Sequence, residues 1–229
     1  MQLSLSRYLR SVGHGPHLPD LPRLPPGIDG RLSTQRLVVR PMVSDDLYDF
    51  YACRSQPEFT ALTPGLIKPF ANIHAAEVCM EQIAHAVKRG VLYPWTVTLE
   101  ATGDIVGNVF LCTILGAEEQ PRLRLEYGID PSHWGHGYGA EALLAIFQQV
   151  FSWQERSFRK IEGSCLAQNI PSARSMERAG MRQVARLEEH YQYEGQLYTL
   201  CVYEILRRDV IPLQIAVDGP LPARISREA

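Results

Sequence analysis

Three alternate glycines carry the clearest chemical signal in the sequence. Gly135, Gly137 and Gly139 stand in the segment HWGHGYGAEA, directly before apolar residues that recur at the helical period. Glycine lets the backbone approach a ligand closely and exposes successive N–H groups, and the helix that follows points its positive end at the same place. This arrangement predicts a site for an anion, most naturally a phosphate, rather than a simple turn.

Two common phosphate loops fit this segment poorly. The spacing Gly135-x-Gly137-x-x-Ala140 matches the dinucleotide fingerprint, which should follow the first strand of a βαβ unit and precede an acidic residue about 20 positions on. Glu155 and Glu162 do not stand where that acidic residue is required. A Walker A loop is excluded, because no Gly-Lys-Ser/Thr follows. A nicotinamide-dependent oxidoreductase therefore stays only as an alternative.

The elements that must position this loop are predicted from periodicity and turn residues. Strands are expected over 35–41, 95–100, 105–115, 122–130, 160–167, 182–191 and 197–208, and helices over 44–55, 73–89, 140–151 and 171–179. A meander of three strands precedes the glycine loop, so the pattern is that of an α+β protein with a mixed sheet. Ser44 and Asn72 are the expected N-caps of the first two helices, and Trp95 and Trp153 are expected in the core.

Composition narrows the classes of function. The 229 residues have a formal net charge of −2 and a pI of about 6.4, so nucleic-acid binding through a strongly basic face is not indicated. No apolar run reaches the ~18 residues of a membrane span. The five isolated cysteines are expected to be reduced thiols of a cytoplasmic protein. Prolines cluster at both ends, which predicts a Pro-rich N-terminal extension over 1–33, one domain over 34–209 and a C-terminal tail over 210–229.

Five segments in the same order resemble one known family. WGHGYGAEAL, after a strand that carries a glutamate, resembles the coenzyme A loop of the GNAT N-acetyltransferases, in the RimJ/RimL-type branch that acetylates ribosomal-protein N-termini. The other four similar segments are TQRLVVRPMVSDD, GDIVGNVFL, AQNIPSARSMERAGM and YQYEGQLYTLCVYEIL. The resemblance implies the acyl-CoA N-acyltransferase fold: α+β, with a mixed, mostly antiparallel seven-stranded sheet that is splayed between strands 4 and 5, and helices on both faces.

The resemblance also implies how acetyl-CoA would bind as the co-substrate. Its pantetheine arm would lie in the splay, its pyrophosphate would lie on the glycine loop, and an Asn-x-x-Ser motif would contact the arm. The residues that match are Tyr127, Gly128 and Ile129 for the pantetheine, Gly135, His136, Gly137, Tyr138, Gly139 and Ala140 for the pyrophosphate, and Asn169 and Ser172 for the motif.

Two positions depart from the pattern of many family members. Trp134 stands where many carry Gln or Arg, as is usual in the RimJ/RimL branch. Met176 stands seven residues after Asn169, where many members carry a tyrosine that acts as general acid. A thioether cannot donate a proton, so a tyrosine acid is absent from that position.

Acetyl transfer to an amine needs a base for the ammonium proton and a proton donor for the leaving thiolate. The resemblance places the base at Glu126, and the alternative is a strand glutamate paired with Arg122 or Arg124. Ser172 is the candidate donor near the sulfur, or it holds the cofactor amide. The alternative is that Ser172 is a helix-start residue that satisfies backbone donors.

The leading hypothesis is an acetyl-CoA-dependent N-acetyltransferase that acts by direct attack of a primary amine, either a peptide N-terminus or a small molecule. The missing tyrosine motivates a second alternative, a non-catalytic acyl-CoA-binding module. No metal is expected, because His133 and His136 alone do not form a metal site. No nucleic acid or membrane partner is expected, and the resemblance allows a homodimer.

Overall fold

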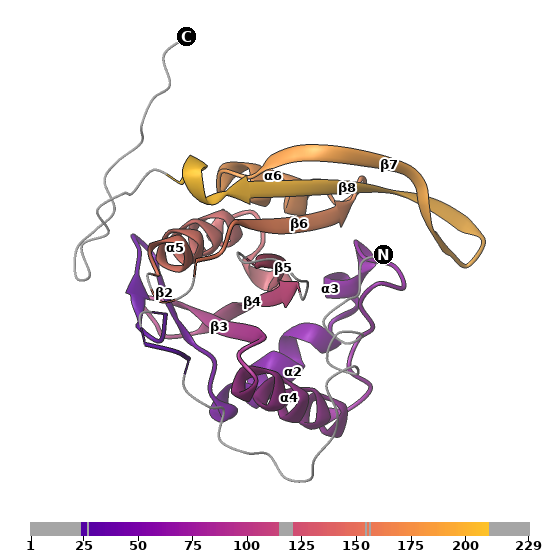
Figure 1. Cartoon of the computed structure of the whole chain (residues 1–229). Coiled ribbons are helices and arrows are strands. Elements are labelled where there is room, and N and C mark those ends of the chain that lie inside the picture. The colour runs from indigo at the N-terminus through magenta and orange to yellow at the C-terminus, as the bar shows by residue number, and fades with distance from the viewer. Residues whose placement is uncertain (1–23, 27, 115–120, 154, 156, 211–229) are drawn as a thin grey trace.

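A single mixed sheet of eight strands crosses the molecule (Figure 1), in the order β1-β2-β3-β4-β5-β6-β8-β7. The computed structural model describes residues 24–26, 28–114, 121–153, 155 and 157–210. All neighbouring strands pair antiparallel except β5 and β6, which are parallel. The strands are β1 (Leu32–Ser33), β2 (Leu37–Pro41), β3 (Leu92–Leu99), β4 (Ile105–Ile114), β5 (Arg122–Ile129), β6 (Lys160–Leu166), β7 (Arg182–Tyr193) and β8 (Gln196–Leu206).

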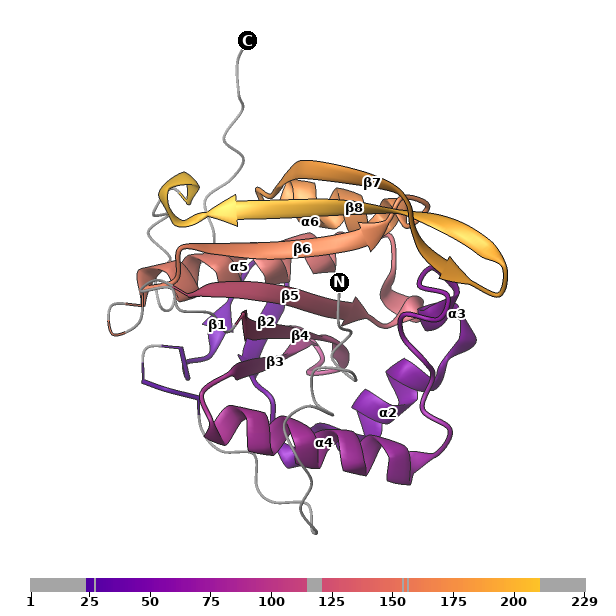
Figure 2. The ribbon, with the colours of Figure 1, turned by 45° about the vertical axis from the view of Figure 1, so that its right-hand side comes forward.

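Helices cover both faces of this sheet. Figures 1 and 2 show α2 and α4 together on one face, and α5 and α6 on the other. The helices are α2 (Leu47–Ser55), α3 (Pro57–Ala61), α4 (Ile73–Lys88), α5 (Tyr138–Ser152) and α6 (Ile170–Arg178), and the short 3-10 turns are η1 (Ser44–Asp46), η2 (Pro131–His133) and η3 (Arg207–Asp209). The predicted α+β class with a mixed, mostly antiparallel sheet is therefore confirmed.

The expected number of seven strands is wrong by one. The additional strand, β1, is a two-residue edge strand in which Leu32 pairs with Val39. Two residues are too short to show an alternating pattern, so sequence periodicity had no means to detect it. Leu24, Ile28 and Leu32 are all buried in the hydrophobic core, so the folded core extends N-terminal to residue 34. Residues 1–23 of the expected extension, and 211–229 of the expected tail, lie outside the described residues.

The start of the first helix also differs from the prediction. Ser44 does not cap α2; it begins the 3-10 turn η1, and α2 starts at Leu47. The Asp46 side chain instead belongs to a buried network. Its carboxylate accepts two hydrogen bonds from Arg40, at 2.6 and 2.9 Å, and one from the Thr96 hydroxyl at 2.7 Å. The network fixes the junction between β2, β3 and α2.

Three local predictions are confirmed. Asn72 caps α4, because its side-chain oxygen accepts a hydrogen bond from the Ala75 N–H at 2.9 Å. Trp95 and Trp153 are both buried. Four of the five cysteines, Cys53, Cys112, Cys165 and Cys201, are buried, and Cys79 is half-buried. Burial raises the pKa of Cys53, Cys79, Cys112 and Cys165 to about 12. Those thiols are therefore neutral and unreactive at physiological pH.

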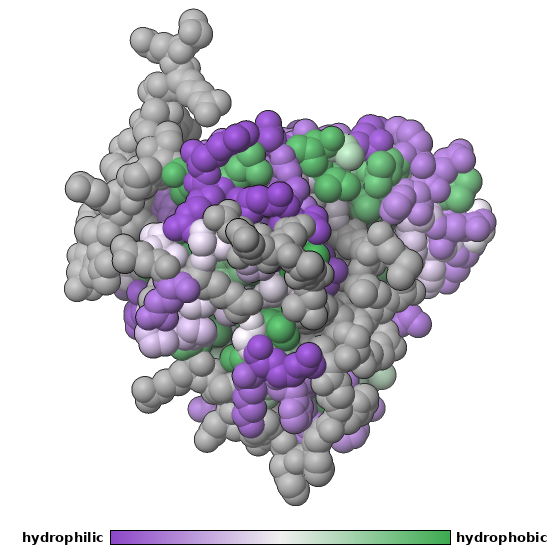
Figure 3. Space-filling view, viewed as in Figure 1, coloured by the Kyte–Doolittle hydropathy of each residue, from purple (hydrophilic) through white to green (hydrophobic). Residues whose placement is uncertain are grey.

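The hairpin of β7 and β8 forms an exposed end of the sheet. Almost every residue of β7 is exposed, and the hairpin surface in Figure 3 is a mixture of hydrophilic and hydrophobic side chains. Near its tip, the rings of Tyr191 and Tyr193 lie so close to Gly65 that a Cβ there would be 2.3 Å from the Tyr193 ring. The segment after α3 is thereby held against the hairpin.

The feature that positions the site is the divergence of β5 from β6. Within the described strands they pair at two positions only, Leu123 with Ile161 and Arg124 with Glu162, whereas β6 pairs with β8 along its whole length. The expected splay lies between the fourth and fifth strands of the predicted set, which are β5 and β6, and it is confirmed. It opens beside the C-terminal half of β5, and leads toward the glycine loop.

Candidate active site

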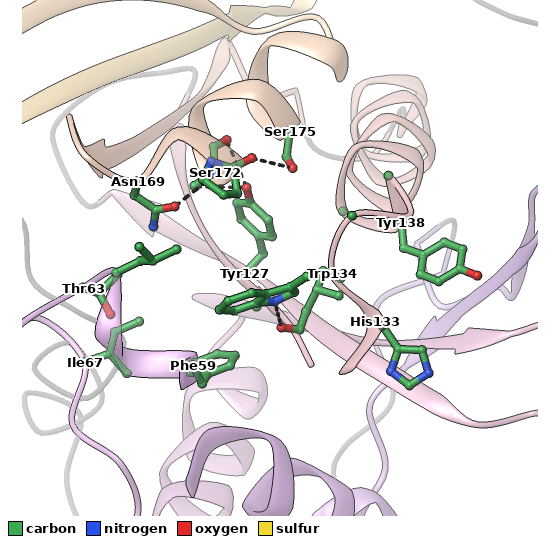
Figure 4. A pocket seen from close by; sticks show the side chains of 17 residues that line it. Phe59, Thr63, Ile67, Tyr127, His133, Trp134, Tyr138, Asn169, Ser172 and Ser175 are labelled. Carbon is green, nitrogen blue, oxygen red and sulfur yellow. Dashed lines mark hydrogen bonds between the residues drawn. The ribbon is translucent and has the colours of Figure 1, made fainter. Parts of the chain in front are cut away.

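Two adjoining cavities fill the splay and form one groove. The first has a volume of about 140 Å³ and extends from the end of β5 to the glycine loop. The second, of about 100 Å³, extends along β5 from Tyr127 past Glu126 to Arg124. Their common wall consists of Thr63, Ile67, Tyr127, Asn169 and Ser172. Figure 4 shows these side chains facing one another from β5, α6 and the segment after α3.

Backbone geometry explains the glycines of the loop. Gly135 and Gly137 have φ angles of 81° and 80°, in the left-handed region that other residues rarely adopt. Gly137 is also the N-cap of α5, so the unpaired N–H groups of the first helical turn begin here. Just ahead, the Trp134 indole donates a hydrogen bond of 2.7 Å to the Ile129 carbonyl (Figure 4). The indole therefore ties the loop to the end of β5.

A clamp from the start of the chain holds this loop in shape. Arg36 donates to the His136 carbonyl at 2.9 Å and binds the Glu141 carboxylate at 2.6 Å. Because a trans peptide points its C=O and N–H in opposite directions, the Gly137 N–H points away from Arg36. Glu141 also accepts a hydrogen bond of 2.6 Å from the Thr34 hydroxyl. Sequence reasoning missed this clamp, because its parts are about a hundred residues apart.

The start of α6 presents a hydroxyl to the groove. The Asn169 side chain caps the helix by accepting from the Ser172 N–H at 3.1 Å. The Tyr127 hydroxyl lies 3.0 Å from Ser172 Oγ and donates to the Ser172 carbonyl at 3.2 Å. Burial raises the pKa of Tyr127 to about 12, so it is a neutral phenol at physiological pH. Met176 is buried over Gly163 and offers no proton donor.

Glu126 lines the second cavity. Its side chain is 16% exposed, and its Oε1 is 3.3 Å from Nη1 of Arg54 on α2. Arg122, one of the two partners considered from the sequence, forms an ion pair with Glu162 at 3.1 Å instead. The carboxylate is therefore a half-buried charge at the cavity wall, with a partner that the sequence did not indicate.

Most of the predicted site residues meet in this groove. Those that line the first cavity are Tyr127, Gly128, Ile129, Gly135, Gly137, Tyr138, Gly139, Asn169 and Ser172. Glu126 lines the second. His136 and Ala140 line neither cavity, and the His136 ring stacks on Tyr138 with the ring centres 5.3 Å apart.

The wall opposite α6 was not predicted. It comes from α3 and the segment that follows, with Phe59, Leu62, Thr63, Leu66 and Ile67. The sequence indicated only that prolines and a glycine interrupt regular structure there. Phe59 packs directly on Gly128, where a Cβ would lie 2.3 Å from its ring. Gly128 therefore leaves space for the Phe59 ring, but the local sequence pattern does not indicate which side chain occupies that space.

Within the described part of the chain, no group of three or more His, Cys, Asp or Glu side chains is arranged to hold a metal ion. The same residues contain no helix that is long and apolar enough to cross a membrane.

Comparison with known proteins identifies the class. The family model described as acetyltransferase (GNAT) domain matches residues 36–182. The chain belongs to the GNAT acetyltransferase family, and it is therefore an acyltransferase, as the resemblance implied.

Individual relatives are distant. An uncharacterized N-acetyltransferase p20 of Bacillus licheniformis is 22% identical over 178 residues, covering 78% of this chain and 97% of the relative. A ribosomal-protein-S5-alanine acetyltransferase from Vibrio fischeri has a similar structure, with a TM-score of 0.68, 16% identity, and coverage of 80% of this chain and 100% of that one. A spermidine N-acetyltransferase from Vibrio cholerae in complex with CoA and spermine also has a similar structure, with a TM-score of 0.64 and 16% identity. The match covers 76% of this chain and 97% of that one. The similar structures thus include the ribosomal-protein branch that the sequence resembles.

Proposed function

We propose that this protein transfers an acetyl group from acetyl-CoA to a primary amine, with Glu126 as the general base. The observation that carries the proposal is the groove of two adjoining cavities, which leads from the glycine loop along β5 to the half-buried Glu126 carboxylate. Such a groove matches an extended cofactor with a phosphate at one end and a reactive thioester at the other.

The proposed cofactor position follows the groove. The pyrophosphate would lie at the N-terminus of α5, where unpaired N–H groups and the helix dipole favour an anion. The pantetheine would follow Tyr127, Gly128 and Ile129 on the splayed side of β5, and Asn169 and Ser172 would contact the arm from α6. The thioester would then lie close to Glu126.

The proposed reaction is a direct attack. Glu126 takes a proton from the ammonium, directly or through water, and the amine nitrogen forms a bond to the thioester carbonyl carbon. The carbon–sulfur bond then breaks, the nitrogen loses its second proton to water, and the thiolate takes a proton from water or from the Ser172 hydroxyl, which in turn regains one from water. Since Met176 cannot donate this proton, Ser172 is the side chain that we place nearest the sulfur.

The acceptor is a primary amine, and two classes are supported by relatives. The similar structures act, according to their names, on a ribosomal protein in one case and on spermidine in the other. A peptide N-terminus and a small amine therefore both remain candidates for this chain. A homodimer remains an expectation from the family resemblance.

The direct test is release of free CoA thiol from acetyl-CoA, measured across a panel of peptides and small amines. We expect thiol release only when an acceptor is present, with one acetylated product per thiol. A protein that binds CoA by calorimetry, yet releases no thiol with any amine, would be the non-catalytic module instead.

Tyr127→Phe tests the contact with Ser172. The change removes only the hydroxyl, which is 3.0 Å from Ser172 Oγ, so the serine loses a partner that orients it. We expect kcat to fall about tenfold, the effect of losing one hydrogen bond, with unchanged CoA affinity. Tyr93→Phe is the matched control, because its buried hydroxyl bonds to the Gly90 carbonyl away from the site. Equal turnover in both variants would rule out a role for the Tyr127 hydroxyl.

Gly137→Val tests the phosphate end of the groove. Valine is strained at a φ of 80°, so the loop must shift and misplace its N–H groups. We expect the Kd for CoA, measured by calorimetry, to rise about tenfold or more. Gly103→Val introduces the same strain at a φ of 80° in an open hairpin turn, and its CoA affinity should not change. If Gly137→Val binds CoA as tightly as Gly103→Val, the pyrophosphate lies elsewhere.

A further inference from the structure

Arg54 is an unusual residue in this core. Its side chain is 7% exposed, and its guanidinium carbon lies 5.0, 5.2 and 5.5 Å from the ring centres of Phe50, Phe110 and Phe59. Its Nη2 atom is buried and has no hydrogen-bond partner within the described residues. A fixed charge in apolar surroundings is costly unless it serves a partner.

The partner is Glu126, reached by Nη1 at 3.3 Å. The two residues are 72 positions apart, on α2 and β5, and the contact crosses from the covered face of the sheet to the groove. Phe59 joins the same arrangement, because its ring stacks near Arg54 and also lines the first cavity. The cation therefore lies behind the carboxylate, on the side away from the groove.

Arg54 reaches Glu126 from another element, whereas Arg124 stands two positions earlier on the same strand and lines the same cavity. Cys79 on α4 and Cys112 on β4 are close enough to interact with the Glu126 charge, but burial raises the pKa of both thiols to about 12 and keeps them neutral. A guanidinium is always protonated and presents its donors in a rigid fork, so Arg54 can hold the Glu126 carboxylate in one place.

We propose that Arg54 is a positioning residue for catalysis: it holds the Glu126 carboxylate at the groove, in the place from which it accepts a proton. This inference rests on the proposed function, in which Glu126 is the base. It assigns a catalytic purpose to a buried arginine that does not line the groove.

The test compares the kcat of Arg54→Met and Arg54→Lys, with an amine accepted in the thiol-release assay, and the Kd of each variant for CoA. Methionine fills the space between the three phenyl rings without a charge, and lysine restores the charge. We expect Arg54→Met to lose about 10- to 100-fold in kcat with an unchanged Kd for CoA, because the carboxylate is no longer held in place while the cofactor end of the groove is untouched. Arg54→Lys should recover most of the activity. Arg54→Gln gives the same test if Arg54→Met does not fold.

A purely structural role has a different signature. It would lower Tm, weaken CoA binding together with kcat, and show no recovery in Arg54→Lys, and that outcome would overturn the proposal. Arg40→Met is the matched control, since Arg40 pairs with buried Asp46 and lines neither cavity of the groove, and its kcat should stay close to that of the unaltered protein.

The Glu126→Gln background separates this proposal from the proposed function. If Arg54 acts through Glu126, adding Arg54→Met to Glu126→Gln causes no further loss of kcat. If Glu126→Gln keeps full turnover, the base assignment fails and this inference fails with it. If Glu126→Gln is inactive but Arg54→Met is fully active, only the role of Arg54 is wrong.

Discussion

Replacing Glu126 with glutamine is expected to lower kcat by about 10²- to 10⁴-fold, the usual contribution of a general base. Glutamine keeps the size of the side chain and can still accept a hydrogen bond from Arg54, but it cannot take the ammonium proton. The loss should appear equally in kcat and kcat/KM, because the interaction that is removed is made in the transition state.

The measurement is thiol release at saturating acetyl-CoA and amine, together with the Kd for CoA by calorimetry. CoA affinity should be preserved, because the pyrophosphate and pantetheine positions are untouched. Glu162→Gln is the matched control: Glu162 is another strand glutamate at the splay, paired with Arg122 and Lys160, and it lines neither cavity of the groove. Undiminished turnover in Glu126→Gln, with an amine that the unaltered protein acetylates, would remove Glu126 from the mechanism.

Replacing Asp46 with alanine is expected to cost about 3 kcal/mol of folding stability, at the lower end of values for breaking a buried ion pair. The carboxylate is 4% exposed and accepts hydrogen bonds from Arg40, the Val43 N–H and the Thr96 hydroxyl. Its removal leaves all three donors without their acceptor, and part of the Arg40 charge stays out of water. The low end applies because Arg40 is 29% exposed and can be partly rehydrated.

Denaturant unfolding measures this cost directly, and Tm should fall by about 6–12 °C for a domain of this size. Asp45→Ala is the matched control, since Asp45 is the exposed neighbour on the same turn. Its effect should stay within about 0.5 kcal/mol. Equal stability of the two variants would show that the Asp46 network contributes nothing to the junction of β2, β3 and α2.

Much of the fold follows from local patterns. Alternation predicts the strand that carries Glu126, and helical periodicity predicts α4 and α5. Asn72 is a recognisable helix start, because capping favours few residue types. The glycine loop was likewise predicted from its own residues, because a ligand-binding turn favours glycine, whereas the Asn-x-x-Ser motif was indicated by the family resemblance.

The remaining parts of the site depend on which side chains meet across the fold. The Tyr127 hydroxyl reaches a serine 45 positions later, and Phe59 packs on Gly128 from a segment that the sequence marks only as irregular. Neither contact repeats at a period of 2 or 3.6 residues, so no local pattern encodes it. The strand β1 was not predicted for a related reason, because a strand of two residues shows no periodic pattern.

The sequence by itself therefore determined the class of fold and the glycine loop, and its resemblance to the GNAT family indicated the splay between two strands and the candidate carboxylate on β5. The tertiary structure alone decided what surrounds that carboxylate: the groove wall after α3, the phenol beside Ser172, and the buried guanidinium behind Glu126. The physical reason is that backbone periodicity and capping act over a few residues. The environment of a charge, in contrast, is set by helices and strands that only packing brings together.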